Sequence, residues 1–265
     1  MVLPDAWFIV RNLWLQYAVM RISAKLSGKV NMKKLIIWDY DGTIADSEKL
    51  WIPVWVETLK KEKNLYLSEE ETFNLMVGIA DREKKINLEK HFPGLLLDDA
   101  FMKKVEEGYI YNEIHCMELI DGVKDVMQDE QFAHCIATGA DRKQHTRKTA
   151  KFQWLKKYDS FTVDMVKHGK PAPDLFLLAA EKEGYKKEDC IVIGDSLNDF
   201  RAADAAGMQS IAFVGGDGNN TPQYRQKCID AGVVAVCATM KEVKQVLNNF
   251  ANGVNLLKLK DSFPR

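Results

Sequence analysis

Residues 34–44 read Lys-Leu-Ile-Ile-Trp-Asp-Tyr-Asp-Gly-Thr-Ile, and this stretch decides the fold. Its first apolar residues, Leu35 to Trp38, come before a glycine-containing turn, which predicts a short buried strand. Ligands of open α/β sheets bind at the carboxyl ends of the strands. Asp39 and Asp41 therefore stand where an aspartate nucleophile and its acid/base partner would lie. Taken alone, the pattern also fits an acidic surface turn or the Asx-capped start of a helix.

A second motif joins an apolar strand pattern to a hydroxyl and a glycine. Residues 135–139 read Cys-Ile-Ala-Thr-Gly, so Thr138 and Gly139 stand where the predicted strand ends. A hydroxyl and free backbone N–H groups at this point can hold a phosphate oxygen. By itself, a threonine after a strand is more often the N-cap of a helix.

A third motif fixes one lysine beside two prolines. Residues 168–174 read His-Gly-Lys-Pro-Ala-Pro-Asp and lead into a helix predicted to run to Gly184. Pro171 disfavours the α conformation at Lys170, and Pro173 suits the first turn of the helix. Exposed lysines are the usual case, so this motif carries weight only beside the others.

The fourth motif repeats the design of the first. Residues 191–199 read Ile-Val-Ile-Gly-Asp-Ser-Leu-Asn-Asp, an apolar strand pattern followed by a glycine, Asp195 and Asp199. A calcium-binding loop also spaces acids closely, but its twelfth residue is glutamate. Residues 195–206 end in alanine, which excludes that interpretation.

Four aspartates at the strand ends of one sheet would crowd negative charge. Two unit charges about 4 Å apart interact by roughly 4 kcal/mol at an effective dielectric of about 20, so such carboxylates must bind cations or take up protons. Mg²⁺ prefers octahedral oxygen ligands, typically one or two carboxylates with phosphate and water, which suits Asp39 and Asp195. Lys170 would also offset the charge of a phosphate group.

These residue types permit covalent phosphoryl transfer. Asp39 can attack phosphorus to give an aspartyl-phosphate, while Asp41 protonates the departing oxygen and later takes a proton from water. Mg²⁺, Lys170, Thr138 and backbone N–H groups would stabilise the charge on the equatorial phosphoryl oxygens.

The four motifs, in this order, resemble those of the haloacid dehalogenase superfamily of phosphohydrolases, over roughly residues 33 to 245. The resemblance implies a Rossmann-like α/β core, with a parallel sheet flanked by helices, and an inserted α-helical C1 cap. It also implies that the backbone carbonyl of Asp41 joins Asp39 and Asp195 as a metal ligand. The implied roles are nucleophile for Asp39, acid/base for Asp41, phosphate binding for Thr138, Gly139 and Lys170, and an outer-shell role for Asp199.

Two positions depart from the common pattern of that superfamily. Tyr40 stands where phenylalanine or leucine is common, and Asp121 stands where proline is frequent; we expect small effects because neither removes a catalytic group. Asp41 argues against the dehalogenase and phosphonatase branches, because members of those branches have no acidic residue at this position.

The spacing of the motifs predicts the domains. Asp39 and Thr138 lie 99 positions apart, whereas Lys170 and Asp195 lie 25 apart, so an insertion leaves the core early. The expected divisions are an N-terminal extension 1–31, a core 32–46 and 119–250, a helical cap 47–118 and a tail 251–265.

Capping signals within the insertion predict four helices. The candidate caps are Asp46 or Ser47, the capping box of residues 68–71, Asp81, and Asp98 or Asp99. Pro53 suggests that the first of these helices starts late or is kinked. By resemblance, closure of such a cap excludes water and contacts the leaving group.

After the insertion, the sequence alternates between helical and strand patterns. A helix that opens at Asp121 is followed by strands within 132–138, 191–193, 210–214 and 233–237. This alternation predicts a parallel sheet with helices on both faces.

Residues 1–31 lie outside the resemblance and are basic and aromatic. Their longest apolar run is too short for a transmembrane helix, which needs about 20 residues. A membrane-surface segment, a targeting peptide and an upstream extension with Met32 as the working start all remain open, and the last is favoured.

Composition limits the remaining choices. A formal net charge of −1 and a pI near 6.5 give no support for nucleic-acid binding. The five cysteines are odd in number and form no Cys-x-x-Cys pair, which fits a reducing cytoplasm. Cys135 and Cys190 are expected in the core.

The leading interpretation is a Mg²⁺-dependent phosphatase of a small phosphate monoester, similar to the phosphoglycolate phosphatase branch. A phosphosugar mutase of the β-phosphoglucomutase type is the alternative, because residues 78–83 faintly resemble its cap loop. A third hypothesis is a catalytically silent binding module, against which the complete set of acids argues. Substrate and oligomeric state are open, and the candidate pocket residues are Trp51, Trp55, Gly78, Arg82, Lys84 and Lys85.

Overall fold

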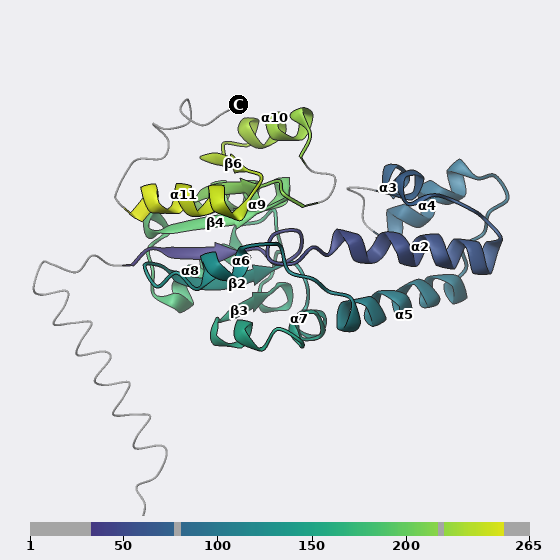
Figure 1. Ribbon diagram of the computed structural model, residues 1–265, viewed down its shortest axis with the longest axis horizontal. Helices are drawn as coiled ribbons and strands as arrows, with labels where there is room; N and C mark the ends of the chain where they lie inside the picture. Colours follow the sequence, from purple (N-terminus) through teal and green to yellow (C-terminus); the bar gives the residue numbers. More distant parts are fainter. Residues whose placement is uncertain (1–32, 77–80, 217–219, 252–265) are drawn as a thin grey trace, which may run out of the picture. The chain divides into compact units, whose positions relative to one another are not determined.

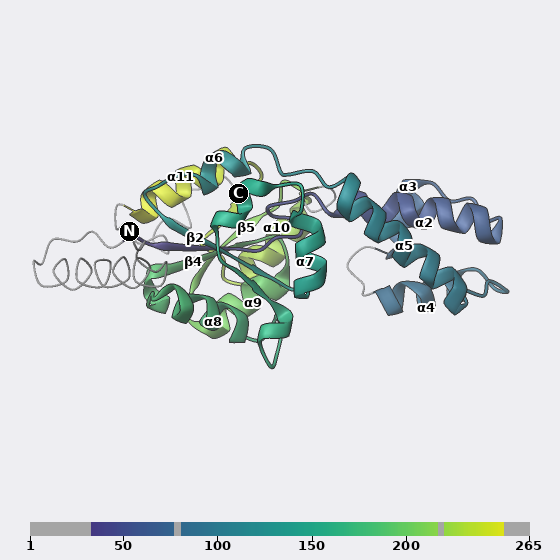
Figure 2. The same cartoon turned by 90° about the horizontal axis from the view of Figure 1, so that it is seen from below.

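A parallel β-sheet forms the centre of the molecule. The computed structural model describes residues 33–76, 81–216 and 220–251, and in this part of the chain six strands pair in the order β3-β2-β1-β4-β5-β6. Helices cover both faces of the sheet (Figures 1 and 2), which confirms the predicted α/β class. The strands are β1 (Leu35–Trp38), β2 (Ala133–Thr138), β3 (Ser160–Thr162), β4 (Cys190–Gly194), β5 (Gln209–Phe213) and β6 (Ala235–Cys237).

The connections between strands supply the flanking helices. In Figure 2, α6 and α11 lie on one face of the sheet, and α8 and α9 lie on the other. Short 3₁₀ turns at Gln153–Lys157, Val163–Met165 and Lys187–Asp189 complete the connections. The helices are α6 (Val123–Met127), α7 (Arg142–Thr149), α8 (Asp174–Glu183), α9 (Leu197–Ala206), α10 (Pro222–Asp230) and α11 (Met240–Ala251).

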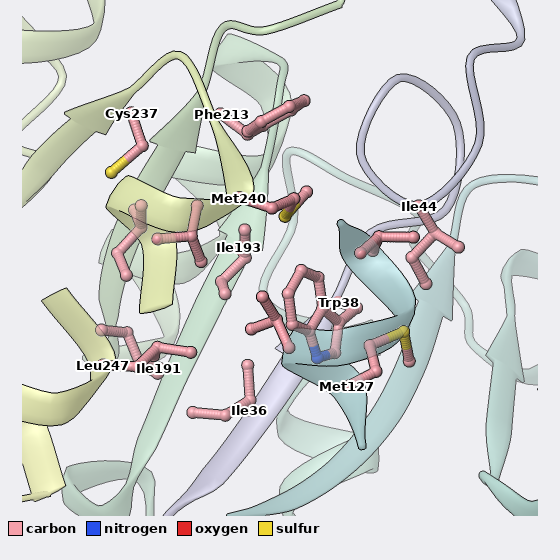
Figure 3. Packing of buried hydrophobic residues seen from close by; sticks show 14 of the residues in the cluster. Ile36, Trp38, Ile44, Met127, Ile191, Ile193, Phe213, Cys237, Met240 and Leu247 are labelled. Atoms are coloured by element: carbon pink, nitrogen blue, oxygen red, sulfur yellow. The ribbon is translucent and has the colours of Figure 1, made fainter. Parts of the chain in front are cut away.

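Alternation along β1 divides the core into two layers. Ile36 and Trp38 point toward α6 and α11, where they pack with Met127 and Leu247 (Figure 3). Their neighbours Leu35 and Ile37 face α8 and α9 instead. All four residues of β1 are fully buried, as the continuous apolar run predicts for a central parallel strand.

Between β1 and α6 the described chain forms four helices, here called the cap. They are α2 (Glu48–Lys63), α3 (Glu69–Met76), α4 (Asp81–His91) and α5 (Asp99–His115). The cap has an apolar core of its own, in which the buried ring of Trp55 lies 5.8 Å from that of Phe101, centroid to centroid. The four helices expected from the capping signals are therefore present.

Two of the predicted capping signals form as expected. Ser68 and Glu71 make a reciprocal capping box at the start of α3, with Ser68 N–H donating to Glu71 Oε2 over 2.8 Å. At α5, the Asp98 carboxylate accepts the Phe101 N–H over 2.9 Å. Gly184 ends α8, as predicted, and is in the left-handed conformation. Gly207 ends α9 in the same way.

The start of α2 lies where the sequence predicted it, but the expected capping bond is missing. Ser47 occupies the N-cap position, but its backbone is already helical and its carbonyl accepts the Leu50 N–H, so its side chain makes no capping bond. Asp46 pairs instead with Lys49 at 2.6 Å. The helix begins at Glu48 and continues through Pro53, so the late start is excluded.

The start of α6 also differs from the sequence prediction. This helix begins at Val123 rather than at Asp121, because Gly122 takes the N-cap position in a left-handed conformation (φ 76°). The predictions for residues 1–31, the side chains of Asp81 and Arg82, Gly78 and the tail beyond Ala251 lie outside the described residues. Among the residues described, no helix has the length and apolar character needed to cross a bilayer.

Candidate active site

The order of the strands marks one edge of the sheet as the ligand site. From β1 the chain passes to β2 on one side and later returns to β4 on the other. Ligands of open α/β sheets bind outside the carboxyl ends of the strands at such a reversal. Asp39 follows β1 and Asp195 follows β4, and the Asp39 N–H donates to the Ile193 carbonyl over 2.8 Å.

Three of the predicted acids meet at this edge. Asp39, Asp195 and Asp199 each offer a carboxylate oxygen, and these oxygens lie within 4.8 Å of one another. Lys170 reaches the same cluster from the loop before α8. Its Nζ hydrogen-bonds to Asp39 Oδ1 and, over 2.6 Å, to Asp199 Oδ1. The first, third and fourth sequence motifs are thus in direct contact.

Burial sets the electrostatics of this cluster. Loss of solvent raises the pKa of Asp39 to about 7, with help from Asp199 and Asp41, and Lys170 offsets only part of this effect. Burial alone would lower the pKa of Lys170, but Asp199 and Asp39 more than compensate and raise it. Lys170 therefore stays charged at neutral pH. Its single positive charge does not balance the negative charge of the three carboxylates around it. A divalent cation would supply the missing positive charge.

Asp199 is held by hydrogen bonds to both of its oxygens. Oδ1 accepts from Lys170, while Oδ2 accepts from the Ser196 hydroxyl over 2.5 Å and from the Ser196 N–H over 3.1 Å. This capping box fixes the start of α9. Both oxygens of Asp199 are thus already hydrogen-bonded, and its outer-shell role stays a prediction.

Asp195 lies against the glycine of the first motif. Thr43 Oγ1 is 3.5 Å from Asp195 Oδ1, and the Tyr224 hydroxyl donates to the Asp195 carbonyl over 2.6 Å. A β-carbon on Gly42 would lie 2.2 Å from Asp195 Oδ2, and Gly42 has a φ of 75°. The positive φ favours glycine at this position, and any side chain there would have to displace the Asp195 carboxylate.

Asp41 faces a pocket between the core and the cap. Its Oδ1 accepts a hydrogen bond from Lys148 Nζ over 2.7 Å. The pocket has a volume of about 200 Å³ and brings Asp41 together with Trp51, Tyr109 and Glu113 of the cap. Asp41, the candidate acid/base, thus lines a cavity together with side chains of the cap. The leaving group of a substrate would lie in this cavity.

Thr138 and Gly139 stand at the end of β2, the neighbour of β1. The Thr138 side chain is fully buried, and its hydroxyl accepts the Ala140 N–H over 3.1 Å. That bond forms a tight turn directly after the strand and keeps the segment compact. Nothing lies within 4 Å of a β-carbon built on Gly139, so space alone does not require glycine there. Phosphate binding by this pair stays a prediction.

The candidate substrate-pocket residues separate into two groups. Trp51 and Lys84 line the pocket, and Lys84 Nζ lies 4.2 Å from the centroid of the Trp51 ring. Trp55 is instead fully buried in the cap, and Lys85 pairs with Glu89 at 3.9 Å along α4.

Sequence reasoning missed Lys148, Glu113 and Tyr224. Lys148 lies in α7, whose sequence Arg-Lys-Gln-His-Thr-Arg-Lys-Thr is polar throughout, so no apolar stripe marks the buried face. Glu113 lies in α5 between Asn112 and Ile114, and a glutamate in a helix is not by itself a sign of burial. To predict the burial of Lys148 or Glu113, one would need to know which helices pack together.

Comparison with known proteins identifies this arrangement. A family model described as haloacid dehalogenase-like hydrolase matches residues 36–213, which is more than half of the chain. The chain belongs to this family. Its solved members include a haloacid dehalogenase-like protein of unknown function from Agrobacterium tumefaciens, which is 26% identical with a TM-score of 0.72. That similarity covers 83% of this chain and 100% of the other.

Two relatives that this haloacid dehalogenase-like hydrolase resembles are named as phosphatases. A fructose-1-phosphate phosphatase of Escherichia coli is 27% identical over 184 residues, covering 66% of this chain and 94% of the relative. A phosphorylated carbohydrates phosphatase of Thermotoga maritima is 24% identical, covering 66% and 82%. The predicted enzyme class, a phosphoric monoester hydrolase of this superfamily, is confirmed.

Proposed function

We propose that the chain is a Mg²⁺-dependent phosphatase that hydrolyses a small phosphorylated carbohydrate through an aspartyl-phosphate on Asp39. The observation that carries the proposal is the contact of Lys170 with Asp39 and Asp199, inside a cluster that also holds Asp195. The Asp39 carboxylate, the Lys170 ammonium and further carboxylate oxygens lie together at the reversal point of the sheet. Few other chemistries need all of these groups at one place.

Asp39 is suited to attack because its partners hold it in place. The Lys170 ammonium binds Oδ1 and leaves Oδ2 for bond formation with phosphorus. The same ammonium would neutralise part of the charge on the phosphoryl oxygens in the transition state. Thr138 and Gly139, at the end of the adjacent β2, would bind a further phosphoryl oxygen.

Asp41 would transfer protons on the leaving-group side of the phosphoryl group, opposite Asp39. Its place in the cavity shared with Trp51, Tyr109 and Glu113 puts it next to the ester oxygen of a leaving group. In the first step Asp41 would give a proton to that oxygen, and in the second it would take one from water. The cap residues around it would limit access of bulk water during the first step.

The donor set fits Mg²⁺. The Asp39 and Asp195 carboxylates and the Asp41 carbonyl would hold the ion, with Asp199 positioned by Lys170 and Ser196 behind them. These are hard oxygen donors of the kind that Mg²⁺ selects. The pKa of Asp39 is raised first by burial and then by the nearby Asp199 and Asp41, and a bound cation would favour the ionised carboxylate. Bound Mg²⁺ would supply charge stabilisation for phosphoryl transfer.

The proposed substrate class rests on the pocket and on the relatives. An aromatic face on Trp51, the Tyr109 hydroxyl and the Glu113 carboxylate offer the mixture of apolar and hydrogen-bonding groups that suits a polyol. Two relatives act on fructose 1-phosphate and on phosphorylated carbohydrates, according to their names. A phosphorylated carbohydrate is therefore the first class to examine.

The test combines turnover with trapping of the intermediate. Phosphate release from a panel of sugar phosphates should require Mg²⁺ and should be abolished in Asp39→Asn, while the variant keeps the wild-type circular dichroism spectrum. Acid quenching of the wild type should yield a phosphorylated peptide that contains Asp39. Full rates in excess chelator, or an adduct on another residue, would overturn the proposal. Isomerised sugar phosphate without net phosphate release would indicate a mutase instead.

A further inference from the structure

A buried lysine on α7 holds the candidate acid/base. Lys148 Nζ lies 2.7 Å from Asp41 Oδ1, and only 9% of the Lys148 side chain is exposed. A hydrogen bond donated by a charged ammonium is roughly twice as strong as one between neutral groups. Lys148 lies in none of the four sequence motifs, so the contact is a feature of this chain's fold rather than of the motifs.

The core fixes the backbone of Lys148 through the residue between the two aspartates. The Tyr40 hydroxyl donates to the Lys148 carbonyl over 3.0 Å, and both groups are buried. The Tyr40 ring also packs edge-on against His145, one turn earlier on α7, with centroids 5.2 Å apart. Tyr40 thus fixes α7 next to the segment that carries Asp39 and Asp41. A phenylalanine at this position would lack the hydroxyl.

The cap reaches the same helix through one carboxylate. Glu113 of α5 accepts hydrogen bonds from Arg147 Nε and from Gln144 Nε2, each over 2.9 Å. Its Oε1 also lies 4.0 Å from Lys148 Nζ. Glu113 is almost fully buried, so these bonds are poorly screened by solvent. Lys148 therefore stands between a carboxylate of the core and a carboxylate of the cap.

We propose that Lys148 is a positioning residue for Asp41, fixed from the core by Tyr40 and from the cap by Glu113. The inference rests on the proposed function, in which Asp41 transfers the proton. Lys148 holds Oδ1 and leaves Oδ2 directed at the leaving-group oxygen. The proton that reaches the leaving group comes from Asp41, and Lys148 keeps its own. A misplaced acid loses on the order of 10²-fold in rate, even when every catalytic group is present.

Positioning of a general acid has a signature that a structural ion pair lacks. An ester with a basic leaving group needs the proton at the moment the bond breaks, whereas one with an acidic leaving group departs as an anion. Phenyl phosphate and 4-nitrophenyl phosphate form a matched pair of this kind, because they share the ring and differ in leaving-group basicity. The value of kcat/KM reports the step that forms the aspartyl-phosphate and so isolates the acid role of Asp41.

The experiment compares Lys148→Met with the wild type on both esters in saturating Mg²⁺. We expect kcat/KM to fall about 10- to 100-fold for phenyl phosphate and less than about threefold for 4-nitrophenyl phosphate. Lys148→Arg should restore most of the loss because it keeps a charged donor. Lys143→Met is the matched control, since Lys143 is an exposed lysine of the same helix. It should leave both values unchanged.

Equal losses on the two esters would overturn the inference, because they would indicate that Lys148 only supports the fold. Should Lys148→Met fail to fold, Lys148→Gln keeps a donor without the charge and must show the same dependence on the leaving group. A different experimental result would reject the proposed function itself. Turnover by Asp39→Asn would reject the proposed function. If Asp39→Asn is inactive but the Lys148 variants lose equal activity on both esters, only the positioning role of Lys148 is rejected.

Discussion

The carboxylate of Asp195 occupies the space beside Gly42 that a side chain would fill. A β-carbon on Gly42 would come within 2.2 Å of Asp195 Oδ2. The turn that follows Asp39, the proposed nucleophile, is thus packed against Asp195, which follows β4. This contact makes the glycine of the first motif part of the proposed metal site, although glycine itself binds nothing.

We expect Gly42→Ala to impair metal binding before it impairs the fold. The new methyl group must displace Asp195, and a φ of 75° costs a non-glycine residue roughly 1–2 kcal/mol. The Mg²⁺ concentration for half-maximal activity should rise at least tenfold, while the melting temperature falls by only a few degrees. Titration of activity with Mg²⁺, beside a thermal melt in chelator, measures both. Gly94→Ala is the control, because Gly94 also has positive φ but has open space around it. An unchanged Mg²⁺ requirement in Gly42→Ala would contradict the role given to Asp195.

The strand ends could be predicted because each joins an apolar run to a turn. In β1 and β4 the run is long enough to indicate a buried strand, and Asp39 and Asp195 follow these strands directly. The sheet edge then brings Asp39 and Asp195 together without any knowledge of tertiary packing. By contrast, β3 has only three residues, Ser160–Thr162, which is too short for any period to appear.

The contacts of Lys148 could not be predicted in the same way. Its partners Asp41 and Glu113 lie 107 and 35 positions away, and each of these pairings depends on how the cap and α7 pack. The sequence of α7 is uniformly polar, so burial of one lysine in it leaves no periodic signal. Tyr40 illustrates the same limit. Its departure from the common pattern is visible in the sequence, whereas the hydrogen bond that it makes is not.

Removal of the Tyr40 hydroxyl should cost stability. In Tyr40→Phe the buried Lys148 carbonyl loses its donor, and an unsatisfied buried group of this kind costs about 1–3 kcal/mol. We expect the free energy of unfolding in urea to fall by about that amount. Tyr111→Phe is the matched control, since 61% of Tyr111 is exposed, and it should change stability by less than about 0.5 kcal/mol. Equal stabilities of the two variants would show that the bond to Lys148 contributes nothing net.

The N-cap of α5 offers a test of the cap alone. Asp98 accepts the Phe101 N–H, and replacement of such a cap by alanine costs about 1 kcal/mol. Asp98→Ala should therefore lower the free energy of unfolding by about that amount, and Asp98→Asn should restore it. Activity under saturating Mg²⁺ should stay close to wild type, because α5 contributes Glu113 to the pocket from its opposite end. A large loss of turnover in stable Asp98→Ala protein would show that the start of α5 influences the site.

The buried position of Asp39 should appear as a pH dependence of stability in metal-free protein. Burial raises the pKa of Asp39 from 3.8 to about 7, so between these values the folded protein holds a proton that the unfolded chain has released. The free energy of unfolding must then fall as pH rises through this window, by at most about 1.4 kcal/mol per pH unit for one proton. Asp39→Asn has no such proton and should show a flatter dependence.

Urea unfolding in chelator at several pH values between 5.5 and 7.5 measures this difference. The stability of the wild type relative to Asp39→Asn should decrease steadily toward neutral pH and level off above about pH 7. Added Mg²⁺ should reverse the decrease, because the ion binds the ionised carboxylate and stabilises the folded state in proportion to its occupancy. Parallel curves for the two proteins in chelator would mean that Asp39 is ionised throughout. In that case Lys170 alone would balance the charge of the site, and the electrostatic argument for a bound cation would fail.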